Sequence, residues 1–121
     1  MGDLTLNEMK IAERFLFLDN AIDVLEAELK GLGDGSFKIK EAYIDKVTKA
    51  IYVGQLERQE LRQEMKRLEI KVEHDKTTDH IYRFIFLAGK RFGNKVYDKN
   101  KLVFEVRKVM YQLLGMPESD N

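Results

Sequence analysis

The sequence contains no cysteine, no tryptophan and a single proline. Without cysteine neither a disulfide framework nor a thiolate metal site can form, and a cytoplasmic protein is expected. Long apolar runs are missing as well. Stretches such as Phe84–Gly89 are interrupted by charge long before the roughly 18 residues that a membrane span needs, so no membrane association is expected.

Residues suited to catalysis are also scarce. The two serines, Ser36 and Ser119, have no histidine near them in sequence, which disfavours a serine nucleophile. The two histidines, His74 and His80, flank a short acidic stretch and could hold a divalent metal. Such pairs arise often by chance in a solvated loop. The sequence therefore predicts a protein that is not an enzyme and has neither a metal site nor a cofactor.

What is present suffices for one folded domain. The chain has 121 residues, of which 44% are hydrophobic and 35% charged, so it can bury a modest core and is not a disordered polyampholyte. Residues 1–115 are predicted to form this domain, and residues 116–121 a polar, flexible tail.

Two long stripes of apolar residues predict two helices, at about 6–30 and 40–66. Thr5 and Glu8 fit a capping box at the start of the first, and a glycine-rich stretch follows it. Because both stripes step by three and four residues, the helices are expected to close on each other as an antiparallel hairpin and also to present a surface for association. The stripe residues are Ile11, Phe15, Leu18, Ile22 and Leu25 in the first helix and Ile44, Val47, Ile51, Leu61 and Met65 in the second.

Gly54 and Arg58 interrupt the second stripe. One interpretation is a close helix crossing at the glycine, with the arginine stem packed and its head in water. The other is a buried charge that fixes the register or meets an anion.

An alternating pattern begins at Leu68 and predicts a β-hairpin over residues 68–88 with a loop at 75–79. The expected pairs are His74 with His80, Val72 with Tyr82, Ile70 with Phe84, and Leu68 with Phe86. This register places the apolar partners on one face. The alternative is that the second helix continues through residue 73 as a rod.

A last helix is predicted over about 101–114, started by Asp98 or Asn100 and stopped by Gly115. Val103, Met110 and Leu114 widen its apolar stripe, so it is expected to touch two surfaces. The predicted fold class is α+β and mostly α, with a long antiparallel helical hairpin followed by a β-hairpin and a C-terminal helix.

Charge is unevenly distributed although the net charge is zero. Residues 1–35 carry a net charge of minus five and residues 89–108 plus five, so the two ends could attract each other or bind outside partners.

Residues 89–95 (GKRFGNK) combine three cations with two glycines and are expected to form a loop. Seven residues are candidates for anion or nucleic-acid binding: Arg58, Lys90, Arg91, Phe92, Lys95, Lys99 and Lys101.

Three functions follow in order of preference. The first is a small non-catalytic interaction protein, accessory or regulatory, that acts through its amphipathic helices as a homo-oligomer or on a protein partner. The second is a nucleic-acid-binding protein that uses the basic segment 89–108. The third is a binder of a nucleotide or another phosphate-bearing small molecule.

Overall fold

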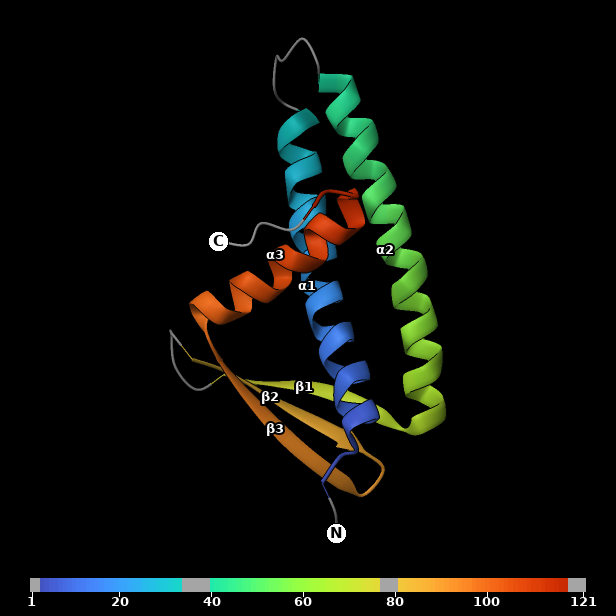
Figure 1. Ribbon diagram of the computed structural model, residues 1–121, viewed down its shortest axis with the longest axis vertical. Coiled ribbons are helices and arrows are strands. Elements are labelled where there is room, and N and C mark those ends of the chain that lie inside the picture. The colour runs from blue at the N-terminus through green and yellow to red at the C-terminus, as the bar shows by residue number, and fades with distance from the viewer. Residues whose placement is uncertain (1–2, 34–39, 77–80, 118–121) are drawn as a thin grey trace.

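A computed structural model describes residues 3–33, 40–76 and 81–117 of the chain. Within these ranges three helices and a three-stranded antiparallel sheet follow one another along the chain (Figure 1). The elements are α1 (Leu6–Gly33), α2 (Lys40–Leu68), β1 (Ile70–Lys76), β2 (Ile81–Ala88), β3 (Arg91–Asp98) and α3 (Lys99–Leu114). The predicted fold class, α+β and mostly α, is confirmed.

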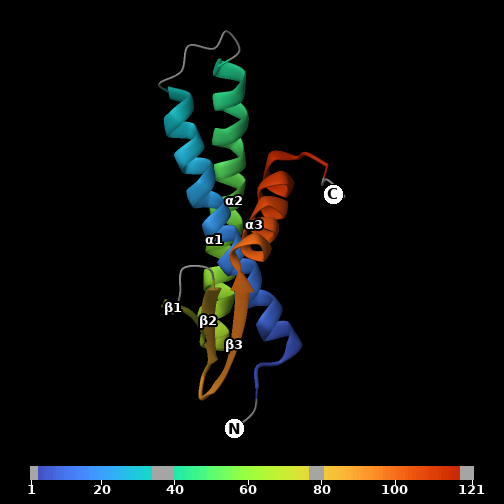
Figure 2. The same ribbon diagram turned by 90° about the vertical axis from the view of Figure 1, so that its left-hand side faces the viewer.

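The helices α1 and α2 lie side by side along the long axis of the molecule, and α3 crosses them (Figures 1 and 2). The sheet packs near the N-terminal end of α1. The predicted capping box is present: the Thr5 hydroxyl accepts a hydrogen bond from the Glu8 amide, and Glu8 Oε1 accepts one from the Thr5 amide. α1 continues through Gly33 rather than ending near residue 30, and the expected connection at 34–36 lies outside the described residues.

A single left-handed residue separates α2 from the sheet. Glu69 has a φ of 57°, and its carbonyl oxygen accepts a hydrogen bond of 3.1 Å from the Gly89 amide. This conformation ends the helix and turns the chain into β1. The alternative of a helical rod through residue 73 is therefore wrong.

The register of the β1–β2 pair differs from the prediction by four residues. Ile70 pairs with Ala88, Val72 with Phe86 and His74 with Phe84, whereas the expected partner of each lay four positions earlier in the sequence. Because four is an even number, each side chain keeps its predicted face. β1 extends through Lys76 and β2 begins at Ile81, so residues 75 and 76 of the predicted loop belong to a strand, and residues 77–79 lie outside the described residues. Leu68 ends α2 and does not belong to the strand.

The expectation that residues 89–95 form a loop is wrong. Gly89 and Lys90 form a two-residue turn, and β3 starts at Arg91, which pairs with Ala88. Gly89 has a φ of 62°, which suits such a tight turn. The residues after it favour a strand because they alternate: Tyr97 is buried against the helices, whereas Phe92 and Val96 are exposed on the other face.

Both ends of α3 are capped. Asp98 Oδ1 accepts a hydrogen bond of 2.8 Å from the Lys101 amide, so the helix begins two residues before the predicted start. Gly115 has a φ of 69° and closes the helix, as predicted from its position. Met116 and Pro117 follow without regular structure, and the rest of the predicted tail lies outside the described residues.

All six elements contribute to one apolar core. Its largest fully buried side chains are Phe86, Leu18, Ile22 and Leu25. Gly54 marks a close approach, since a Cβ built there would lie 3.0 Å from Ile22 Cγ1 and 3.1 Å from Leu113 Cδ1. The expectation of a close helix crossing at Gly54 is confirmed.

None of the described helices combines the length and the apolar character that crossing a bilayer would require.

Candidate functional site

Much of the apolar stripe predicted for association is used inside the chain. Leu18, Ile22 and Leu25 are fully buried, and six further stripe residues pack into or against the same core from the two helices. The stripe residues packed in this way include Ile11, Phe15, Val47, Ile51, Leu61 and Met65, while Ile44 is half-buried. A surface for another molecule must therefore depend mainly on other residues.

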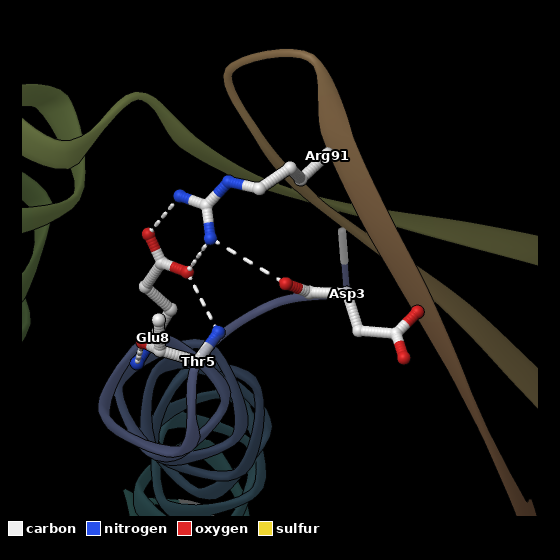
Figure 3. Close-up of polar contacts among 4 residues, drawn as sticks. All are labelled: Asp3, Thr5, Glu8 and Arg91. Atoms are coloured by element: carbon white, nitrogen blue, oxygen red, sulfur yellow. Dashed lines mark hydrogen bonds and ion pairs between the residues drawn. The ribbon is translucent and has the colours of Figure 1, made fainter. Parts of the chain in front are cut away.

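Arg91 is held by α1 rather than being free to bind an anion (Figure 3). Its Nη1 and Nη2 atoms donate to Glu8 Oε1 and Oε2 at 2.7 and 2.5 Å, and Nη1 also reaches the Asp3 carbonyl oxygen at 3.5 Å. The hydrogen bonds from Arg91 and Thr5 lower the pKa of Glu8 from 4.5 to about 2. This pair joins the acidic and basic ends within the chain.

Arg58 is likewise committed to a partner. Its Nη1 donates to Asp19 Oδ1 at 2.8 Å across the α1–α2 interface, and the arginine side chain is only 18% exposed. The arginine head thus meets a carboxylate instead of extending into water. This contact fixes the two helices relative to each other and leaves Arg58 little capacity for an outside anion.

The remaining candidates for anion binding are dispersed. Lys90 and Phe92 are exposed in and after the β2–β3 turn, and Lys99 is exposed at the start of α3. Lys95 and Lys101 line the same polar hollow between α1, β3 and α3. The expected pairing of His74 with His80 is wrong, since His74 pairs with Phe84 and stacks on its ring at 4.7 Å. His80 lies outside the described residues.

An apolar depression follows α3 where this helix crosses the hairpin. It consists of two adjoining hollows of about 400 and 580 Å³ that share Met110. We call it the α3 trough. Its apolar and aromatic lining residues are Val24, Leu25 and Leu32 from α1, Tyr43 and Val47 from α2, and Leu102, Val103, Val106, Met110, Tyr111 and Leu114 from α3.

The α3 trough remains open although it is apolar. Val24, Tyr43 and Val103 are 41%, 51% and 45% exposed, so substantial apolar surface faces water at one place. Contiguous apolar surface of this kind is typical of sites that bind another molecule. Its two hollows carry opposite charges at their borders, with Arg107 of α3 at the smaller hollow and Glu28 of α1 at the larger one.

Sequence reasoning found only part of this surface. Val103, Met110 and Leu114 were recognised as a second apolar side of the last helix, and the structure places all three along the trough. Val24 and Tyr43 lie beside the regular stripes of their helices and gave no signal in the sequence. They matter only because α3 crosses at that level of the hairpin.

The fold and this surface define a class: a small α+β protein built on a helical hairpin, with an antiparallel sheet at one end and an apolar trough beside a crossing helix. The YhjD protein family matches residues 3–118, and the chain belongs to this family. It is 21% identical over 108 residues to the uncharacterized protein YhjD of Bacillus subtilis (strain 168), covering 89% of this chain and 90% of that protein. No solved structure matches the chain significantly.

Proposed function

We propose that this protein is a small non-catalytic interaction protein, accessory or regulatory in role, which acts as a homo-oligomer through the α3 trough. The exposure of Val24, Tyr43 and Val103 around one apolar depression is the observation that supports this proposal. Burying such a surface is favourable because each square ångström of apolar area removed from water contributes roughly 25 cal/mol.

The charges at the trough favour a second copy as its occupant. Glu28 of α1 borders the larger hollow and Arg107 of α3 borders the smaller one, so the two charges mark different ends of the trough. In a two-fold symmetric contact whose axis crosses the trough between the two hollows, the larger hollow of one molecule faces the smaller hollow of the other. The end that carries Glu28 then meets the end that carries Arg107, and the apolar residues between them are covered.

Light scattering after size-exclusion chromatography tests the proposal. Wild-type protein is expected at twice the monomer mass or more, and Val24→Asp at the monomer mass because it places a charge in the apolar contact. Val53→Asp is the matched control. Val53 is a valine of α2 with 42% exposure that does not line the trough, so its variant should keep the wild-type mass.

A charge swap tests the relative orientation of the two copies. Arg107→Glu should weaken the oligomer because two acidic ends of the trough then face each other, and adding Glu28→Arg should restore it. A wild-type chain that stays monomeric over a wide concentration range would contradict the homo-oligomer and leave the trough to a different protein partner. Equal loss of assembly in Val24→Asp and Val53→Asp would also contradict the proposed interface.

A further inference from the structure

The polar hollow between α1, β3 and α3 has a volume of about 420 Å³ and differs in character from the α3 trough. We call it the cationic pocket. α1, β3 and α3 each contribute to its lining, which comprises Lys10, Glu13, Arg14, Phe17, Lys95, Tyr97, Lys101 and Glu105. The lining therefore contains four cationic side chains and two carboxylates.

Two aromatic rings support the pocket. Phe17 and Tyr97 are buried and meet edge to face, with their ring centroids 5.6 Å apart. The Tyr97 hydroxyl donates a hydrogen bond to Glu13 Oε2. Burial, and next this hydrogen bond, raise the pKa of Tyr97 well above its usual value, so the phenol stays neutral and keeps its proton on the Glu13 side.

Both carboxylates of the pocket already have partners. Glu13 accepts the hydrogen bond from Tyr97, and Glu105 pairs with Lys101 at 3.0 Å and with Lys108 at 3.7 Å. Arg14 is neutralised from outside the pocket, since its Nε and Nη2 atoms donate to the Glu57 carboxylate at 2.6 and 3.0 Å.

Lys10 and Lys95 are the cations that remain. Within residues 3–33, 40–76 and 81–117 neither ammonium group has an ion-pair or hydrogen-bond partner. They come from α1 and β3, which are held together by the Glu8–Arg91 pair and by the contact of Tyr97 with Phe17. Among the described residues, the fold therefore places two ammonium groups without ion-pair partners at one concave site, where the Glu13 carboxylate offsets part of their charge.

We infer that the cationic pocket binds a small phosphorylated molecule, with its phosphate held by Lys10 and Lys95. A phosphate monoester is the matching group because it carries close to two negative charges and accepts hydrogen bonds from ammonium groups. The volume lies in the range of small-ligand sites. A nucleic-acid strand fits less well, since Glu13 and Glu105 would repel the phosphates on either side of the bound one.

Titration of the full-length protein followed by two-dimensional NMR tests this site. Inorganic phosphate and adenosine monophosphate are the probes, and adenosine is the uncharged comparison. Both phosphates should shift the amide signals of Lys10, Lys95 and their neighbours, whereas adenosine should not. The double change Lys10→Ala and Lys95→Ala should weaken binding of both by about tenfold or more, because two of the phosphate's ion pairs are lost.

A double variant of equal charge provides the control. Lys49→Ala with Lys90→Ala removes two exposed lysines that do not line the pocket, so phosphate binding should stay within about twofold of wild type at physiological salt. Glu13→Gln should tighten binding, because a negative charge leaves the pocket while the side chain can still accept from Tyr97. A gain of affinity cannot arise from a failure to fold.

Three outcomes would overturn the inference. The first is equal loss of binding in the two double variants, which would indicate diffuse attraction by surface charge. The second is no shift of the pocket signals with either phosphate. The third is tighter binding of a mixed-sequence oligonucleotide that also depends on Lys10 and Lys95, which would assign the pocket to nucleic acid.

Discussion

At the scale of single residues, Glu8 has two structural roles. Its carboxylate caps the first turn of α1 at the Thr5 amide and also binds the Arg91 guanidinium through both oxygens. A capping residue is usually a local feature of one helix. Here it also connects the N-terminal end of the chain to β3, so its ionisation affects two elements.

Glu8 should make the protein sensitive to acid. Its pKa is near 2 in the folded protein against an ordinary value of 4.5, so the fold favours the carboxylate form. The stabilisation is fully present above the unfolded pKa and is lost as the pH falls from about 4.5 towards 2. In urea unfolding, the stability difference between wild type and Glu8→Gln should be largest near about pH 6 and shrink across this window.

Glu64→Gln is the comparison for this experiment. Glu64 also has a lowered pKa, caused by its hydrogen bond and ion pair with Arg67 three residues later on the same helix. Exposed pairs of this kind contribute little to stability. Its substitution should therefore change the pH profile much less. An equal effect of the two variants would show that Glu8 does not join the two ends of the domain.

At the scale of the elements, Gly54 sets the distance between helices. It lies inside α2, where a glycine would normally be unfavourable, but Ile22 of α1 and Leu113 of α3 leave no room for a larger side chain. The absence of a side chain at this position allows three helices to meet.

Filling that space should destabilise the protein. Gly54→Val would push branched carbons against Ile22 and Leu113, and overpacking of this kind costs about 2 kcal/mol. Gln55→Val introduces the same side chain at the next, exposed position and should change the free energy of unfolding by a few tenths of a kcal/mol. Chemical denaturation of both variants provides the measurement. Similar midpoints would mean that the helices do not approach closely at Gly54.

At the scale of the whole molecule, α3 decides which surfaces remain open. It covers the middle of the hairpin with Val106 and Val109 and leaves an apolar trough beside Met110. The exposed apolar side chains at the rim are therefore a consequence of how three helices cross, and they are grouped on one side of that crossing.

If the trough joins two copies, thermal stability should depend on protein concentration. Association removes folded monomers from the unfolding equilibrium, so the Tm of wild-type protein should rise over a roughly hundredfold increase in concentration. The Tm of Val24→Asp should stay constant over the same range. Differential scanning calorimetry measures both, and a wild-type Tm that does not change with concentration would contradict the proposed assembly.

The sequence by itself determined the types of the elements and their faces. Apolar periodicity, the Thr5–Glu8 box and the stop at Gly115 are local signals, because hydrogen bonds and burial along one helix depend on residues three or four apart. The alternation after Leu68 indicated strands, because successive side chains of a strand point to opposite faces of the sheet. It fixed the inward face of β2 although the register was four residues off.

Only the tertiary structure decided which charges are free and which apolar residues are exposed. Arg91 and Arg58 looked available in the sequence, yet each meets an acid from α1, 83 and 39 residues away along the chain. Lys10 and Lys95 became neighbours of one pocket only when β3 packed beside α1. Such contacts depend on how separate elements meet in space, and no local pattern records the position of a partner that lies far away in the chain.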